Sequence, residues 1–147
     1  MATNTPWLPS CLRAVSERYG PLPLAIPLSS KRTFYMNMNN YRNQHYRSLS
    51  KAKRDFCAHC DGLWPSGISI PPLRYPLIFF YELYLRPNYR HDLSNVGSVL
   101  DKFFADYLVD TAVLEDDDTS HVNGVIYHYG GDDPSPHGFL TLCRYKS

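Results

Sequence analysis

Apolar residues recur along the chain at two different spacings, which separate the expected helices from the expected strands. From Val96 onward they fall at positions 96, 99, 100, 103, 104, 107 and 108, which is the spacing of one helix face. Ser94 or Asn95 is a suitable N-cap for that helix. Residues 77–85 form the clearest strand pattern, because they are aromatic and β-branched and are bounded by prolines.

The other expected elements are shorter. Strand patterns occupy residues 24–28, 33–38, 122–129 and 139–144, and the last two are expected to form a hairpin around the polar loop 130–138. Helical patterns occupy residues 44–61 and, more briefly, 10–19, and residues 65–76 are expected to form a loop. The order of the main elements, β-β-α-β-α-β-β, predicts an α+β fold with a mixed sheet and two main helices.

The length of 147 residues suits one domain with a buried core. Residues 1–23 contain four of the twelve prolines, so we expect residues 1–21 to form an N-terminal extension and residues 22–147 to form the domain. No apolar run approaches the roughly 18 residues that a membrane span needs, and no secretory signal is recognisable. These observations predict a cytoplasmic protein that does not bind membranes.

Charge is distributed unevenly, although the net charge is only +1. Residues 92–118 hold eight of the fourteen Asp and Glu and a single base, Lys102. Residues 31–54 hold seven of the fifteen Lys and Arg and no acid. This polarity predicts an acid-lined metal centre beside a surface that attracts phosphates.

The acidic segment contains the candidate metal site. Its candidate residues are Asp92 before the helix, Asn95, Lys102 and Asp106 on one helix face, and Asp116, Asp117 and Asp118 after the helix. If residues 122–129 pair beside residues 77–85, we expect Asp92 and the three later aspartates to converge. Carboxylates are hard ligands that favour Mg²⁺ or Mn²⁺, and such an ion lowers the pKa of a bound water for attack on a phosphodiester. Solvated acids with a simple i, i+4 pair of Lys102 and Asp106 are the alternative.

The basic segment is a candidate nucleic-acid surface. Its candidate residues are Arg42, Arg47, Lys51, Lys53 and Arg54, interleaved with Tyr35, Tyr41 and Tyr46, together with Arg86 and Arg90 in the loop before the acidic segment. Cations of this kind follow a phosphate backbone, and aromatic rings stack on bases. A solvated helix face explains the same residues, and DNA or RNA binding without catalysis is an alternative function.

Four cysteines are present, and Cys57 and Cys60 have the CxxC spacing of zinc sites. Structural zinc usually takes two such pairs, and the sequence has no second pair. We therefore expect free thiols and no zinc. A zinc-stabilised interaction module built on these two cysteines is the third possible function.

The spacing within residues 92–118 resembles that of the RusA-type Holliday junction resolvases, which are small endonucleases of bacteria and phages. That family has an Asp-x-Asp-Asn motif, a lysine, an Asp-Ala-Leu motif four residues later, and an Asp-Asp pair about ten residues beyond. Here Asp92-Leu-Ser-Asn95 stands for the first motif, Lys102 and Asp106 keep the four-residue step, and Asp106 and Asp116 keep the ten-residue step. The asparagine-rich, basic residues 37–45 also resemble phage members, and the whole resemblance covers roughly residues 22–145.

The resemblance implies a homodimer that cuts four-way DNA junctions with Mg²⁺ at two symmetric sites, in recombination, repair or phage DNA processing. Under this resemblance Asp92 and Asp117 would be metal ligands with Asp116 beside them. Lys102 would be the catalytic lysine, and Asn95 and Asp106 would shape the site.

Two positions depart from the family pattern. Ser94 stands where the family has its second Asp, and four extra residues separate Asn95 from Lys102. Asp101, Asp118 or a water would have to replace the missing ligand, and we expect Asp118 because a loop can adapt. A nucleic-acid-binding protein of the same fold that has lost this ligand is the alternative.

Overall fold

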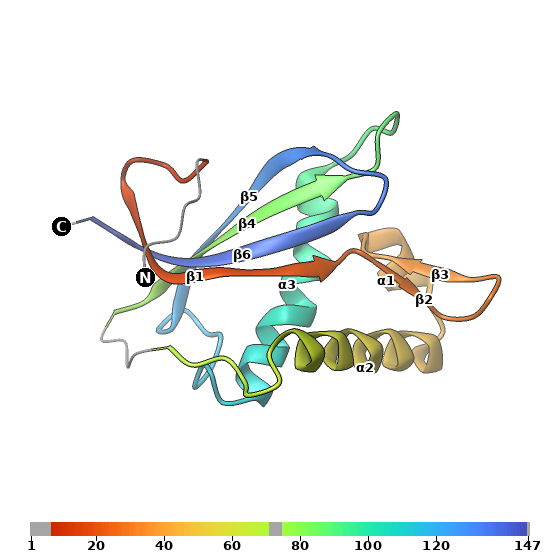
Figure 1. Ribbon diagram of the computed structural model, residues 1–147, viewed down its shortest axis with the longest axis horizontal. Coiled ribbons are helices and arrows are strands. Elements are labelled where there is room, and N and C mark those ends of the chain that lie inside the picture. Colours follow the sequence, from red (N-terminus) through yellow and green to blue (C-terminus); the bar gives the residue numbers. More distant parts are fainter. Residues whose placement is uncertain (1–6, 71–74, 147) are drawn as a thin grey trace.

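The computed structural model describes residues 7–70 and 75–146. Residues 1–6 of the expected extension, residues 71–74 of the expected loop and residue 147 lie outside this description. A four-stranded sheet carries two long helices, and a two-stranded sheet lies with a short helix at one end of the molecule (Figure 1). Within the described ranges, no helix is both long and apolar enough to cross a bilayer.

The α+β class and the mixed sheet are confirmed. In chain order the elements are β1 (Leu12–Pro23), β2 (Ala25–Pro27), β3 (Thr33–Tyr35), α1 (Met38–Asn43), α2 (Tyr46–Leu63), β4 (Leu77–Leu85), α3 (Leu93–Asp110), β5 (Val122–Asp132) and β6 (His137–Tyr145). The strand patterns at residues 24–28 and 33–38 become the short pair β2 and β3, which form the separate two-stranded sheet.

Strand β4 lies inside the main sheet, whose order is β1-β6-β4-β5. Eight of its nine residues are buried, which suits a strand covered on both faces. It runs parallel to β5 and antiparallel to β6, so the predicted β5–β6 hairpin is wrong. The connection between them crosses the end of β4, where the Asp133 N–H donates to the Leu85 carbonyl over 2.8 Å.

The helix expected at residues 10–19 is wrong, because this segment belongs to strand β1. Irregularities in its pairing with β6 interrupt the strand alternation between Ala14 and Arg18 and between Tyr19 and Leu22. The buried positions consequently fall at 12, 16, 19 and 22, which imitates helical spacing. The boundary expected between residues 21 and 22 falls inside this strand.

Helices α2 and α3 pack on one face of the sheet. The alternate β4 residues Leu77, Phe79, Tyr81, Leu83 and Leu85 belong to the large core that these helices share, whereas Ile78 and Phe80 join a smaller cluster with Leu12 and Cys143. Gly97 of α3 allows the helix to approach β5 closely, since a Cβ there would lie 2.3 Å from the Tyr127 ring. The N-cap of α3 is Asp92, two residues before Ser94, the earlier of the two predicted caps.

A partly buried ion pair connects three strands on the other face of the sheet. The Arg18 Nε of β1 donates to Glu82 Oε1 of β4 over 2.9 Å, and Glu82 is only 1% exposed. The guanidinium lies 3.5 Å from the centroid of the Phe139 ring on the intervening β6. The paired and hydrogen-bonded carboxylate therefore meets the usual condition for burying a charge.

Candidate functional site

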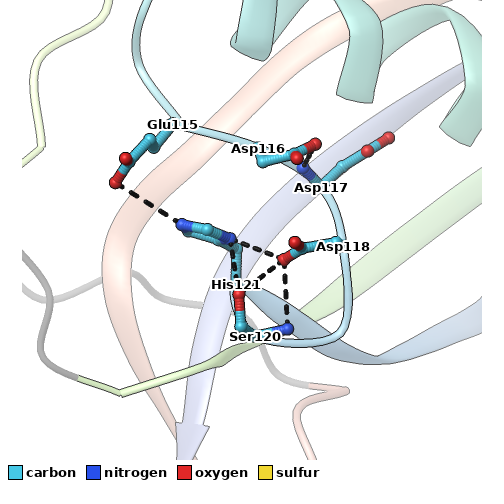
Figure 2. Close-up of polar contacts among 6 residues, drawn as sticks. All are labelled: Glu115, Asp116, Asp117, Asp118, Ser120 and His121. Carbon is cyan, nitrogen blue, oxygen red and sulfur yellow. Dashed lines mark hydrogen bonds and ion pairs between the residues drawn. The ribbon is translucent and has the colours of Figure 1, made fainter.

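The acidic loop, defined here as residues 111–121, connects α3 to β5 and places its four consecutive acids in different environments (Figure 2). Oδ1 of Asp118 accepts hydrogen bonds from the Ser120 N–H over 3.1 Å and from the Ser120 hydroxyl over 2.6 Å. The same oxygen lies 2.7 Å from His121 Nδ1, and His121 Nε2 lies 3.6 Å from Glu115. Asp118 therefore stabilises its own turn.

These contacts shift the ionisation of both partners. Hydrogen bonds from Ser120, and then from His121, lower the pKa of Asp118 to about 2. The pKa of His121 is raised, chiefly by its hydrogen bond to Asp118 and further by Glu115. At neutral pH the Asp118 carboxylate is therefore ionised, and its Oδ1 already accepts hydrogen bonds from Ser120 and lies beside His121.

Asp117 points away from the Asp118–His121 pair (Figure 2), and its carboxylate has no hydrogen-bond donor among the described residues. Its charge instead raises the pKa of Asp101, in the middle of α3. Asp101 is partly buried, and burial is the main cause of its raised pKa. The negative charge of this loop carboxylate therefore makes ionisation of the helix carboxylate less favourable.

A tyrosine from the sheet positions Asp101. The Tyr81 hydroxyl of β4 donates to Asp101 Oδ1 over 2.7 Å, and Tyr81 is fully buried. Burial, followed by the charge of Asp101, raises the pKa of Tyr81 well above its ordinary value, so its proton stays in place to donate. The ring of Tyr127 on β5 lies beside the Tyr81 ring, with centroids 5.9 Å apart.

Asn95, Lys102 and Asp106 follow one line along α3, on the side that faces α1 and α2. The Asn95 side chain accepts a hydrogen bond from the Met38 N–H over 3.1 Å and so connects α3 to α1. The Lys102 Nζ lies 5.8 Å from the centroid of the Tyr41 ring. Asp106 lines a cavity of about 80 Å³ between α2 and α3, together with Lys53. The charge of Lys102 also lowers the pKa of Asp101.

The prediction that Asp92 converges with Asp116, Asp117 and Asp118 is wrong. Strand β5 is parallel to β4, so the connecting helix α3 must run antiparallel to both strands. Asp92 therefore lies where β4 ends, and the acidic loop lies where β4 begins. Eighteen helical residues, about 27 Å at 1.5 Å per residue, separate the two ends of α3.

Asp92 serves as the N-cap of α3. Its Oδ1 accepts hydrogen bonds from the N–H of Ser94 over 3.0 Å and from the Ser94 hydroxyl over 2.8 Å. Together with the N–H of Asn95, these donors lower the pKa of Asp92. Ser94, which replaces the expected second aspartate, is a donor to this cap.

The two basic segments meet at Arg86. Its guanidinium lies 4.3 Å from the centroid of the Tyr35 ring, at the end of β3, and 4.6 Å from that of Tyr89 in its own loop. His91 Nε2 lies 2.9 Å from the Arg86 carbonyl and orders the same loop. Within the described ranges no carboxylate pairs with Arg86, so its N–H donors face no protein anion. This Arg86 cluster, defined as Tyr35, Arg86, Tyr89 and His91, joins residues 31–54 to residues 86–91.

The other predicted DNA-binding residues are distributed over α1, α2 and the loop before α3. Lys51 forms an ion pair with Asp55 over 2.5 Å, and Arg47 donates to the Tyr46 hydroxyl over 3.2 Å. Lys53 turns inward, with its Nζ 5.9 Å from the centroids of both the Tyr41 and the Phe103 rings. Arg42, Arg54 and Arg90 form no ion pair within residues 7–70 and 75–146.

Metal-binding geometry is limited in the described part of the chain, where no group of three or more His, Cys, Asp or Glu is arranged to hold an ion. Mg²⁺ often takes only one or two protein carboxylates and completes its shell with waters and substrate phosphates. Asp101 and Asp117 fit that donor set. Cys60 is buried on α2 and Cys143 on β6, and all four cysteines are free.

Sequence reasoning gave Asp101 only a minor place, and it missed Tyr81 and Tyr127. Asp101 follows Gly97 by four residues and precedes Phe104 by three, and both of these neighbours are buried. An acid beside the apolar stripe of a helix is a signal of partial burial. The sequence contains no comparable signal for the two tyrosines, because their contact with Asp101 depends on how the sheet pairs.

No protein-family model matches this chain, and no curated protein matches it.

Proposed function

We propose that the protein is a metal-dependent endonuclease of branched DNA that acts as a homodimer on four-way junctions. The observation that carries this proposal is the Asp101 carboxylate, which the Tyr81 hydroxyl holds over 2.7 Å and which the charge of Asp117 influences from the acidic loop, on a helix whose N-terminal end lies near the Arg86 cluster. A basic, aromatic surface would hold the phosphate backbone, and the two carboxylates would hold Mg²⁺ or Mn²⁺. DNA processing of this kind takes place in the cytoplasm of a bacterial or phage-infected cell.

The contacts favour a ligand set that differs from the one expected. Asp118 is occupied by Ser120 and His121, and Asp92 caps α3 at its far end. Asp101 replaces them, because it lies within the electrostatic range of Asp117 and its Oδ2 accepts no hydrogen bond from the described residues. Asp116 remains adjacent in the loop, where it accepts the Asp117 N–H over 2.7 Å.

Each side chain then has a separate role. The Tyr81 hydroxyl would fix the orientation of Asp101 by its hydrogen bond. Bound Mg²⁺ would polarise the phosphodiester and lower the pKa of an attacking water. The ammonium of Lys102 would stabilise the negative charge that develops on the phosphate. Asn95 shapes the site by holding α1 against α3.

The separation of Asp92 from the acidic loop favours a second candidate, a nucleic-acid-binding protein without nuclease activity. It would use the same Arg86 cluster and the same basic helices, and the acids would remain solvated. The two candidates differ in one measurable property, which is phosphodiester cleavage in the presence of Mg²⁺.

The test is incubation of synthetic four-way junctions with the wild-type protein in Mg²⁺ and, separately, in Mn²⁺. Paired nicks are expected from the wild type. Asp117→Asn and Asp101→Asn are each expected to reduce the nicking rate at least 100-fold while junction binding is retained, since each removes a metal ligand. Glu115→Gln is the matched control, because this side chain is 90% exposed in the same loop and is not part of the pair.

Junction binding without nicks in both metals would exclude the nuclease and support the binding protein. Nicking that survives in both Asp117→Asn and Asp101→Asn would show that the carboxylate pair is not the metal site. Nicking lost equally in Glu115→Gln would show that the variants act through the total charge of the loop.

A further inference from the structure

The two edges of the main sheet are protected to very different degrees. The edge strand β1 contains Arg13, Glu17 and Arg18, two prolines, and two irregularities in its pairing. Charges, prolines and bulges are the usual means by which an edge strand avoids pairing with another chain. The β1 edge is therefore well protected.

The β5 edge has fewer of these features, because it lacks lysine, arginine and proline and its two pairing irregularities lie near its ends, between Val122 and Gly124 and between Tyr129 and Gly131. Its eleven residues, VNGVIYHYGGD, include no Lys, Arg, Glu or Pro, and the single acid Asp132 is the last residue. Pairing with β4 is regular from Gly124 to Tyr129, so the centre of the strand has no bulge. Across residues 123–132 the described part of the chain provides no backbone hydrogen bond to the outer side of β5. An edge of this length with open donors and acceptors is a template for another strand.

Two exposed apolar side chains are symmetrically placed near the centre of β5, whereas its other exposed residues, Asn123 and Asp132, lie near its ends. Val125 is 38% exposed and Tyr129 is 45% exposed, and these are two of the six exposed large hydrophobic residues in the described ranges. They flank Tyr127 by two residues on each side, so all three side chains point to the same face of the sheet. Their β4 partners Phe79, Tyr81 and Leu83 identify this as the face that carries the helices.

We propose that β5 pairs antiparallel with β5 of a second copy of this chain, about a two-fold axis at Tyr127. Within the regular centre of the strand, this register places Val125 opposite the partner's Tyr129. Each exposed apolar side chain thereby gains an apolar cross-strand partner, which contributes to sheet stability. No two like charges face each other there, since residues 124–129 contain no Lys, Arg, Asp or Glu. The two sheets become one continuous eight-stranded sheet.

This interface rests on the proposed function in one respect only, namely that two copies of the chain associate. Strand β5 is the surface through which they would do so. The interface also places the two candidate sites near one seam, because Tyr81, which holds Asp101, pairs with Tyr127 in the sheet. A two-fold interface uses the same surface on both copies, so that surface must be complementary to itself. Residues 125–129 meet this condition, because Val125 and Tyr129 lie at equal distances on either side of Tyr127.

The first test uses disulfide trapping without DNA. Val125→Cys and Tyr129→Cys are made separately in a Cys11→Ser background, since Cys11 is an exposed thiol. The two proteins are mixed under reducing conditions, allowed to exchange subunits, and then oxidised. Directly opposed residues in an antiparallel pair are about 4.5–5.5 Å apart at Cα, within reach of a disulfide. Identical positions on the two copies are offset by four residues, about 13 Å, which is too far.

A covalent dimer of twice 16.9 kDa is therefore expected in the mixture and not in either protein alone. Equal crosslinking in all three samples, or none in the mixture, would overturn the proposed register.

The second test measures mass by analytical ultracentrifugation. The wild type is expected to sediment as a dimer. Val125→Lys combined with Tyr129→Lys is expected to sediment at half that mass, because lysines would face each other across the seam. Tyr145→Lys is the matched control, since Tyr145 is 63% exposed at the end of β6. A monomeric wild type, or a dimer that persists in the double variant with its circular dichroism unchanged, would overturn the inference.

These measurements are independent of nuclease activity. A dimer that never nicks DNA would leave this interface in place and remove the proposed function. A monomer that nicks junctions would remove both this interface and the proposed homodimer, and would leave the nuclease activity in place.

Discussion

Asp117 and Asp118 are adjacent and chemically identical, yet their surroundings differ. Asp118 is held by Ser120 and His121, whereas Asp117 points away from them and its charge raises the pKa of Asp101. The sequence presents a run of equivalent acids, because hydrogen bonds within a turn depend on backbone torsions that composition does not reveal. The local hint that Asp118 forms a side-chain turn is the pair of polar residues that follow it by two and three positions, Ser120 and His121.

The pairing of His121 with Asp118 makes the acidic loop sensitive to pH. The pKa of His121 is raised above 6.5, so the folded loop favours the charged ring. The His121 contacts therefore stabilise the folded protein fully at pH values below the pKa of this histidine in the unfolded chain. This stabilisation is lost as the pH rises through the higher pKa that His121 has in the folded protein. An NMR titration of the His121 ring should therefore give a higher pKa in the wild type than in Asp118→Asn. Glu115→Gln should lower it less, and an unchanged pKa in Asp118→Asn would contradict this account.

At the scale of elements, helix α3 presents candidate functional residues on two different sides. One side carries Asp101 toward β4 and β5, and the other carries Asn95, Lys102 and Asp106 toward α1 and α2. The helical spacing in the sequence correctly predicted the buried face between these sides. It did not show which strand lies beneath each side, because several sheet orders are compatible with one apolar stripe.

The close approach of α3 to β5 can be tested at Gly97. In Gly97→Ala a Cβ would lie 2.3 Å from the Tyr127 ring, and overpacking of this kind costs about 1–3 kcal/mol. Alanine also gains up to about 1 kcal/mol of helix propensity, so the net loss in unfolding free energy should be about 1–2 kcal/mol. Gly62→Ala in α2 is the matched control, since nothing lies within 4 Å of its Cβ position and only the gain applies. Chemical denaturation measures both changes, and equal effects would argue against the contact.

At the scale of the whole molecule, charge is separated along the β4–α3–β5 crossover. The Arg86 cluster lies where β4 ends, and the acidic loop lies where β4 begins. A basic surface at one end can hold a polyanion while the acids at the other end bind cations, and both ends are connected by a single rigid helix. The near-neutral net charge of the chain conceals this arrangement.

DNA binding should therefore depend on salt in a way that identifies the basic end. The affinity for a four-way junction in Ca²⁺, plotted against salt concentration on logarithmic axes, should lose about one unit of slope in Arg86→Ala, since one phosphate contact is removed. Arg13→Ala is the matched control, because Arg13 is exposed near the opposite end of the sheet. Fluorescence anisotropy measures both slopes, and an equal loss in Arg13→Ala would show that only the total charge matters.

The sequence by itself determined the two long helices, the central strand, the α+β class and the separation of acidic from basic segments. These features follow from local periodicity and composition, which depend on residues close in the chain. Strand order, the bulged course of β1 and the separation of Asp92 from the acidic loop were decided only by tertiary structure. The physical reason is that strand pairing joins residues far apart in sequence, and one parallel pair fixes the direction of the helix between them. Since β5 runs parallel to β4, α3 carries Asp92 away from the acidic loop, and Asp101 in the middle of the helix is the acid whose pKa the charge of Asp117 raises.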